Sequence, residues 1–595
     1  EQTYPFWTAN DTVHLGMSKT LSTNVLHYIL LDVGSKLATE KGDNTTADKF
    51  NTWKNDLKEA ISLNFYLDDE NLFAAMKTTY LNNVAIKKFD LLGQSLAVIS
   101  GVASDTEAEN CVSHYPLTDA GPSVIWPQEP TTRIYHNRAV WPFVTAYALK
   151  AAIKVENDAA YNNAVFSLYR GSAFNLSNME NFEFTTLANN YYDSRKDYSN
   201  RDLTGPVVNS QRQLWSVAGY ISMVLEGIFG LSATQTGIKF EPKISKSVRN
   251  TIFASTSVIT LKNFKYKGKT IDITITLPEI SAQNTGFWVT NEIRLNGTLK
   301  TGEITASELS ATNTLEITMK DGTNSGEVVL KNCSDESNCF APHATSITSV
   351  VPSNGKLNVT FSASSGNSSY GISSVTYNIY RDGVLIASNI TSPWSDPNSG
   401  DYANKSYCYS VTAISNKGLE SHISSPICYW GESYNRIETV SVNSFSQVPN
   451  ATDHGRPHFA DWGKTTDELT VPSFAPLSTG TYLMQIEYGS GRPIDTGITA
   501  CFKTVEIYEN GTNQLVASDY IVMPHLGGGN WDYWGNSSFL EVQLNSTKTY
   551  KIVIKDFLNM SYFNHFVIYT AGAGGGEDVY NRANIGGIKF LLKEK

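Results

Sequence analysis

The spacing of apolar residues changes within residues 213–240, QLWSVAGYISMVLEGIFGLSATQTGIKF. Up to Gly230 apolar residues recur three and four positions apart, the spacing of one helix face: Leu214, Val217, Ile221, Val224, Leu225 and Ile228. Gly230 then follows as a helix C-terminal cap would. From about residue 238 apolar and polar residues alternate, as they do in a strand. The chain is therefore predicted to be helical before about residue 235 and built of strands after it.

Five segments further upstream share the helical spacing: residues 21–37, 50–65, 91–102, 140–151 and 165–168. Two long loops rich in aromatic residues, 113–138 and 174–212, lie between these segments. Loops of that length in a compact domain are usually functional. The helical part therefore also holds the segments in which a site is expected.

Downstream, residues 259–261 and 271–275 alternate as two strands, and Lys267-Gly268 supplies the turn between them. A short linker with the sequence NCSDESNCF separates this first β unit from the next. We predict three β units: residues 238–331, 343–430 and 432–595. With the helical part they make four domains, as a chain of 595 residues suggests.

Composition excludes several classes of protein. Hydrophobic residues make up 41% of the chain, too many for a disordered protein, and the net charge is −11. The absence of a Lys/Arg run argues against a nucleic-acid partner, and no apolar run of about 18 residues is long enough to span a membrane. No Cys or His cluster has metal-ligand spacing, so neither a metal nor another cofactor is expected. The chain begins with Glu1 and not Met, which indicates a processed or incomplete chain.

The six cysteines indicate the compartment. Cys333 and Cys339 lie in a short polar loop, and Cys408 and Cys428 lie on successive strand-like segments. We expect these two pairs as disulfides, with Cys111 and Cys501 free, although scattered free thiols are the alternative. Disulfides place a protein in the extracellular space, on the cell surface or in the periplasm. Several Asn-x-Ser/Thr sequons, Asn175 and Asn389 among them, would permit glycosylation there.

The two long loops carry residue types that suit a sugar ligand. Aromatic rings stack on the apolar faces of a sugar, and planar donors and acceptors meet its hydroxyls. The predicted substrate-binding residues are Trp126, Gln128, Glu129, Tyr135, His136, Asn137, Arg138 and Trp141. Glycoside hydrolysis further requires two carboxyl groups across the scissile bond. Glu180 or Glu183, in the run NMENFE, can supply one of them.

Residues 1–235 resemble the second half of a six-hairpin (α/α)6 glycosidase, in the group of glycogen-debranching enzymes and processing α-glucosidases. The shared stretches are EQTYPFW, STNVLHYILL, IWPQEP, YHNRAVWPFV, NMENFE and QLWSVAGYISMVLEGIFG. The resemblance implies that Glu180 is the general base, with Glu183 in reserve, and that the general acid lies at or before Glu1. It implies an inverting reaction, with acid and base about 6.5–9.5 Å apart. The predicted fold class is multidomain: an α-helical (α/α)6 toroid portion followed by three all-β sandwich or jelly-roll domains.

The later β units resemble accessory modules. Residues 343–430 resemble a fibronectin type III domain through VTYNIYRDG and YCYSVTA, and residues 432–595 resemble a carbohydrate-binding jelly roll through YNRANIGGIKFLL. The first unit, 238–331, resembles a sandwich packed beside the toroid. Sugar-stacking aromatic residues are expected on loops of the last module: Trp462, Trp531, Tyr533 and Trp534.

Each candidate also has a structural interpretation. His136 could hydrogen-bond a loop carbonyl, and Arg138 could pair with Glu129 or Asp119. Trp141 and the module aromatics could be core residues, and Glu180 could cap a helix.

Two functions follow from these observations. The first is a secreted glycoside hydrolase that acts on an α-linked oligo- or polysaccharide and carries a C-terminal carbohydrate-binding module. The alternative is a non-catalytic carbohydrate-binding or structural surface protein that retains part of a glycosidase scaffold. Six helices are half of a toroid, so we expect a partner: the N-terminal half of the same polypeptide or another chain. That partner would cover a stripe around Val25, Leu96 and Tyr147.

Overall fold

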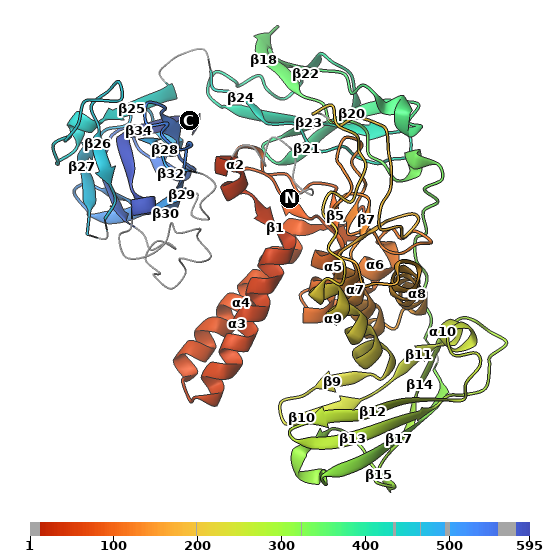
Figure 1. Ribbon diagram of the computed structural model, residues 1–595. Helices are drawn as coiled ribbons and strands as arrows, with labels where there is room; N and C mark the ends of the chain where they lie inside the picture. Colours follow the sequence, from red (N-terminus) through yellow and green to blue (C-terminus); the bar gives the residue numbers. More distant parts are fainter. Residues whose placement is uncertain are drawn as a thin grey trace.

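The computed structural model describes residues 12–197, 199–322, 324–431, 436–464, 466–493, 500–556 and 579–595. A helical part lies near the centre of the molecule, and three groups of β-sheets lie around it (Figure 1). Strands hold 36% of the residues and helices 25%. The molecule is therefore mostly β.

All six expected helices are present, and α2, α6 and α10 are further helices that the apolar spacing did not predict. The helices are α2 (Thr12–Met17), α3 (Leu21–Glu40), α4 (Asn44–Phe65), α5 (Leu91–Ser100), α6 (Asp105–His114), α7 (Pro142–Lys154), α8 (Asp158–Asn175), α9 (Leu214–Ser222), a π-helical turn (Met223–Ile228) and α10 (Lys246–Thr251). Local signals fix their starts: the Asp90 carboxylate accepts from the first turn of α5, and Ser104 and Glu107 form a capping box on α6.

Four two-stranded ladders pin the loops of the helical part. They pair β1 (Lys19–Thr20) with β4 (Met76–Lys77), β2 (Tyr66–Leu67) with β3 (Leu72–Phe73), β5 (Phe89–Asp90) with β6 (Ile125–Trp126), and β7 (Ala139–Val140) with β8 (Phe182–Glu183).

The predicted (α/α)6 toroid is wrong. α3 and α4 form a long hairpin that extends away from the other helices, and no ring of helices is present in the described part of the chain (Figure 1). The apolar face of α8 packs against a β-sheet, where the Tyr161 ring lies 5.2 Å from the ring of Phe287 in the first β unit. Helical spacing specifies that a face is buried but not what buries it, and here a sheet does.

The expected inner stripe is covered within the chain itself. Val25 and Leu96 are buried, and Tyr147 packs against the same cluster. A different row on the hairpin faces outward: Leu26, Leu30, Val33 and Leu37 are 52%, 67%, 47% and 54% exposed. A partner segment on this part of the molecule stays a prediction.

The first β unit contains a six-stranded sheet with the path β11-β14-β17-β13-β12, in which β15 pairs with β14, and a three-stranded sheet β16-β10-β9. Its strands are β9 (Leu231–Ala233), β10 (Gly237–Phe240), β11 (Lys243–Ser245), β12 (Val258–Tyr266), β13 (Lys269–Thr276), β14 (Phe287–Leu295), β15 (Thr298–Leu299), β16 (Ile304–Thr305) and β17 (Thr312–Asp321). The turn between β12 and β13 is the expected one, with positive φ at Lys267 and Gly268.

The second β unit packs a three-stranded and a four-stranded sheet, β18-β19-β22 and β21-β20-β23-β24. Its strands are β18 (Ile347–Ser353), β19 (Lys356–Phe361), β20 (Val375–Arg381), β21 (Val384–Ile390), β22 (Trp394–Asp396), β23 (Tyr407–Ser415) and β24 (Ile427–Tyr429). Tyr407, Tyr409 and Val411 of β23 lie in one core cluster, as their alternation along the strand requires.

The C-terminal unit contains two sheets, β25-β34-β28-β31, to which β26 and β32 add, and β27-β33-β29-β30. Its strands are β25 (Ile437–Ser441), β26 (Phe459–Trp462), β27 (Glu468–Phe474), β28 (Gly480–Gly489), β29 (Ala500–Glu509), β30 (Gln514–Pro524), β31 (Gly535–Asn536), β32 (Leu540–Leu544), β33 (Tyr550–Asp556) and β34 (Ala583–Glu594). One apolar core, which includes Tyr482, Ile507 and Phe590, fills the space between them. The domain limits proposed from the sequence stay a prediction.

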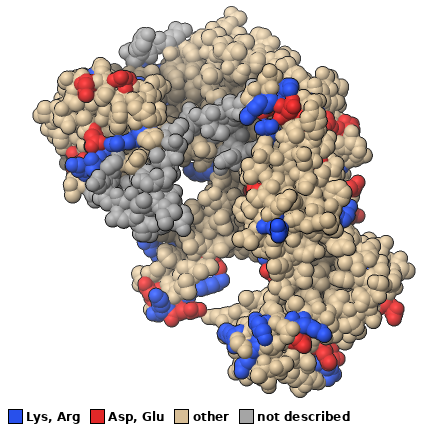
Figure 2. Space-filling view, in the orientation of Figure 1, with Lys and Arg blue, Asp and Glu red and all other residues tan. Residues whose placement is uncertain are grey.

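Charged side chains form small mixed groups on the face shown in Figure 2, where Lys and Arg lie beside Asp and Glu. Lys300–Glu308 and Lys548–Glu509 are ion pairs of 2.5 Å each. In the described ranges, none of the helices is both long and apolar enough to cross a membrane.

Both expected disulfides are present, Cys333–Cys339 and Cys408–Cys428, and the second joins directly opposed residues of β23 and β24. Cys111 and Cys501 are free and buried. A thiol reagent added to the unfolded, unreduced protein should therefore label two cysteines, and mass spectrometry should find six labels only after reduction. Labels on Cys333 or Cys408 before reduction would contradict the pairing.

Candidate functional site

The β7–β8 ladder brings the two long loops together. Ala139 pairs with Glu183, Val140 pairs with Phe182, and the amide of Phe184 donates to the carbonyl oxygen of Arg138 at 3.0 Å. The loop that holds Tyr135 and His136 therefore lies beside the loop that holds Glu180. Of the residues predicted from the sequence, some lie at or next to Glu180 and others hold the two loops together.

Glu180 is held in a fixed position and is 4% exposed. Its Oε1 accepts from the hydroxyl of Tyr135 at 3.2 Å, and its Oε2 accepts from the backbone amide of Ser210 at 2.9 Å. The backbone also holds it, because the Glu180 amide donates to the carbonyl oxygen of Ser210 at 2.9 Å. Glu180 is thus a preorganised carboxylate, and it is not the cap of a helix.

An aromatic cluster lies next to Glu180. The ring of Tyr135 is 4.7 Å from that of His136 and 5.1 Å from that of Trp141, and Trp141 is 5.6 Å from Trp215. The Trp141 indole N–H donates to the Tyr135 carbonyl oxygen at 2.6 Å, so Trp141 is a buried support. Trp215 is 44% exposed and stacks on Phe143 at 4.8 Å. It can therefore offer part of its ring surface to a ligand.

His136 is half-buried between Tyr135 and Trp141. Burial lowers its pKa to about 4, so the imidazole is neutral at physiological pH. A neutral imidazole has one donor and one acceptor nitrogen, which suits a hydroxyl group of a ligand.

Glu183, the reserve candidate, has a different environment. Its Oε2 accepts four hydrogen bonds, from the backbone amides and the hydroxyls of Thr185 and Thr186, at 2.7–3.0 Å. A carboxylate that ties down its own turn in this way organises the loop after β8. Glu1, the third catalytic candidate, lies outside the described residues.

Gln128 and Asn137 hold the first long loop together from inside. Both are fully buried, and Gln128 accepts from the Arg138 amide at 2.6 Å while Asn137 accepts from the Glu129 amide at 2.6 Å. Trp126, one of the predicted substrate-binding residues, is 3% exposed and packs in the core.

Glu129 and Lys88 form a buried ion pair at the base of this loop, with exposures of 4% and 2%. The Lys88 ammonium also donates to the Pro127 carbonyl oxygen at 3.0 Å. Burial alone would raise the pKa of Glu129, but the neighbouring basic groups hold it below its ordinary value. His422 of the second β unit lies 3.6 Å from the Glu129 carboxylate, and its burial lowers its pKa to about 4. Glu129 therefore stabilises the loop and its contact with the next domain.

Arg138 pairs neither with Glu129 nor with Asp119. Its guanidinium donates to Asp193 at 2.6 Å, and Asp193 also accepts from Arg195. Arg195 in turn makes two hydrogen bonds, of 2.7 and 2.9 Å, to Glu336 of the linker. The sequence did not identify Asp193, Arg195 or Glu336, because partners so distant in the chain leave no spacing signal.

The aromatic residues predicted to bind sugar on the C-terminal module differ in exposure. Trp462 is 8% exposed in the core of the C-terminal unit, whereas Tyr533 is 58% exposed. The Trp531 ring lies 5.1 Å from the Arg492 guanidinium, and the Trp534 ring lies 5.0 Å from that of Arg456. Trp531, Tyr533 and Trp534, which we call the module patch, thus form a half-exposed aromatic surface with cations beside it.

No protein-family model and no curated protein matches the chain. Among solved structures, a family 35 carbohydrate binding module from Clostridium thermocellum matches at 14% identity, with 26% of this chain and 98% of that chain covered and a TM-score of 0.18. The C-terminal CBM6 of LamC, a marine laminarinase from Zobellia galactanivorans, matches at 12% identity over 26% and 98%, with a TM-score of 0.16. A sialidase matches at 14% identity over 50% of this chain and 26% of that chain, with a TM-score of 0.34. These likenesses are too weak to transfer a residue or an activity.

Proposed function

We propose that this protein is a glycoside hydrolase that acts on an α-linked oligo- or polysaccharide and holds it through the C-terminal module. The observation that carries the proposal is Glu180: a nearly buried carboxylate, held by Tyr135 and the Ser210 amide, beside a partly exposed Trp215. The two disulfides fit an oxidising compartment. The proposed place of action is therefore the extracellular space, the cell surface or the periplasm.

In this proposal the Glu180 carboxylate removes a proton from a water molecule as the water attacks the anomeric carbon. The Tyr135 hydroxyl and the Ser210 amide fix both carboxylate oxygens, which keeps the base oriented without using up all its lone pairs. The exposed part of the Trp215 ring would contact the sugar, and the neutral His136 would bond a hydroxyl. A second carboxyl group must protonate the leaving oxygen, and inversion of configuration is proposed for the overall reaction.

A second candidate function is carbohydrate binding without catalysis. The observation that favours it is the position of Glu183, whose carboxylate accepts from Thr185 and Thr186. Among the described residues, Glu180 is then the one predicted catalytic carboxylate at the site, whereas hydrolysis requires two. Incubation of the full chain with a panel of α-glucosides and α-mannosides separates the two functions. Release of sugar supports the hydrolase, and binding without release supports the second function.

Replacement of Tyr533 by Ala should weaken binding to a gel-embedded polysaccharide by about twofold to tenfold, because a stacked ring contributes about 0.5–1.5 kcal/mol. Affinity electrophoresis measures this change. Tyr520→Ala is the matched control, since Tyr520 is 56% exposed but lies on β30 outside the module patch. Equal retardation of both variants would remove the module patch from the binding surface.

A further inference from the structure

A cavity of about 630 Å³ lies on another part of the helical domain, where its loops meet the linker and the second β unit. Such a volume falls within the range of small-molecule sites, about 300–1,000 Å³. Its lining comes from several regions of the chain: residues 118–120, Arg138, the segment from Glu183 to Tyr191, the disulfide loop at 331–336 with Phe340, and residues 370–371. Neither Glu180 nor the aromatic cluster beside it is among the described residues that line this cavity. The cavity is therefore distinct from the Glu180 site.

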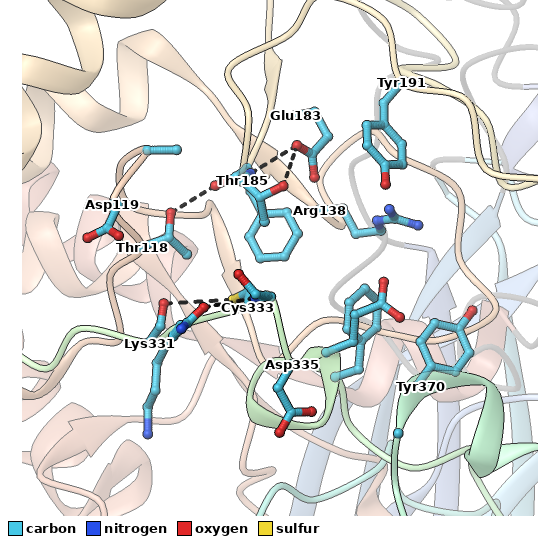
Figure 3. Close-up of a pocket in the computed structure, with 17 residues that line it drawn as sticks. Thr118, Asp119, Arg138, Glu183, Thr185, Tyr191, Lys331, Cys333, Asp335 and Tyr370 are labelled. Atoms are coloured by element: carbon cyan, nitrogen blue, oxygen red, sulfur yellow. Dashed lines mark hydrogen bonds between the residues drawn. The ribbon is translucent and has the colours of Figure 1, made fainter.

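Arg138 lines the cavity and carries an unused donor. It is 2% exposed, and its Nε–H has no hydrogen-bond partner within the described residues, although another nitrogen of the group donates to Asp193. A buried donor without a partner costs about 1–3 kcal/mol, so such a group is expected to meet a ligand or water. Figure 3 shows Arg138 reaching toward Tyr191, with Tyr370 across from them.

Aromatic rings form one side of the cavity. The Arg138 guanidinium lies 5.2 Å from the Tyr191 ring and 5.5 Å from the Phe340 ring. Tyr370 is 4.8 Å from Phe340 and 4.3 Å from the Arg195 guanidinium, and its hydroxyl donates to the Pro130 carbonyl oxygen. These contacts hold the rings in place before any ligand arrives, so the aromatic wall is preorganised.

The charges of the lining select the class of ligand. Four carboxylates line the cavity against two cations, Arg138 and Lys331; the carboxylates belong to Asp119, Glu183, Asp335 and Glu336. This excess of acidic groups disfavours a phosphate or another anion. A bare metal ion could not accept from the Arg138 Nε–H. A neutral polyhydroxylated ring can do so, and it can also donate to carboxylates and lay its apolar face on an aromatic wall.

We infer that this cavity is a second carbohydrate-binding pocket, in which the Arg138 Nε–H donates to a hydroxyl oxygen of a short neutral sugar that lies against Tyr191. The inference rests on the proposed function only for its class of ligand. It assigns Arg138 to a pocket separate from the Glu180 site, and it assigns the linker loop at 331–336 to the lining of that pocket.

Isothermal titration calorimetry on the full chain tests the pocket, with glucose, mannose, galactose and maltose as probes and with sodium phosphate and calcium chloride as alternatives. Arg138→Lys keeps a cation for Asp193 but lacks the Nε–H, and Tyr191→Ala removes the ring. Both should weaken binding of at least one sugar by about tenfold or more. Tyr192→Ala is the matched control, because Tyr192 is the next residue, is 71% exposed and does not line the cavity. Circular dichroism checks that each variant folds.

The outcomes separate this pocket from the Glu180 site. Sugar binding that is lost in Arg138→Lys and Tyr191→Ala but kept in Tyr192→Ala supports the pocket. Sugar binding that survives in both pocket variants overturns the inference. Binding of phosphate or calcium without binding of any sugar also overturns it. Neither result affects the proposed function. Loss of binding in the pocket variants, with hydrolysis unchanged in Glu180→Gln, supports the pocket and removes the proposed catalytic role of Glu180.

Discussion

Replacement of Glu180 by Gln should lower kcat by about 10²–10⁴-fold on whichever α-glucoside or α-mannoside the protein hydrolyses, while KM changes little. General base catalysis typically supplies a factor of that size, and Gln cannot accept the proton from water. The amide keeps the shape of the carboxyl group: its one oxygen can still accept from the Ser210 amide, while its NH2 group can donate to the Tyr135 hydroxyl oxygen. The loss should therefore reflect chemistry more than folding, and initial-rate kinetics measure it.

Glu183→Gln is the matched control for this experiment. Its carboxylate accepts from Thr185 and Thr186 and faces its own turn, so its replacement should leave kcat within a few-fold and lower thermal stability instead. Unchanged kcat in Glu180→Gln, together with a large loss in Glu183→Gln, would exchange the two roles. Unchanged kcat in both variants would contradict the assignment of the base to this loop.

The sequence predicted six of the helices and the change to strands after them, because that information is local, but it missed α2, α6 and α10. The helix from Leu214 to Ile228 shows in apolar spacing alone, although Leu214 and Ile221 of that face are 82% and 51% exposed, and Lys267-Gly268 shows its turn in residue type. The toroid failed because its evidence was a resemblance between segments. Whether Tyr161 of α8 packs against a helix or against Phe287 of a strand depends on contacts that no local pattern records.

The candidate site was predictable in a similar way. Glu180, Tyr135 and His136 lie within two short runs, and their residue types drew attention to both loops. The same reasoning could not separate ligand-facing side chains from those that hold the loop, such as Gln128 and Asn137, because both kinds are polar. The second pocket could not be predicted from the sequence, because Tyr370, one of its lining residues, lies far from Arg138 along the chain, in the second β unit.

Replacement of Glu129 by Gln should lower the free energy of unfolding by about 3–5 kcal/mol, the largest effect on stability that we expect from a single change in this chain. Glu129 and Lys88 are 4% and 2% exposed, and the variant leaves the Lys88 ammonium buried without its carboxylate. Burial already lowers the pKa of Lys88, so the amine should lose its proton more readily in the variant. Urea denaturation, followed by tryptophan fluorescence, measures the loss.

Asp69→Asn is the control, because it breaks the neighbouring Lys87–Asp69 pair, in which Asp69 is 65% exposed. Surface pairs contribute about 0–1 kcal/mol, so this variant should unfold almost as the wild type does. In the double variant Lys88→Met/Glu129→Gln no buried charge is left alone, and part of the stability should return. A loss in Glu129→Gln no greater than that in Asp69→Asn would show that water or a shifted proton satisfies Lys88. The Glu129 amide donates to Asn137, in the loop that holds Tyr135, and the Tyr135 hydroxyl donates to Glu180. A loop loosened by Glu129→Gln should therefore also lower kcat.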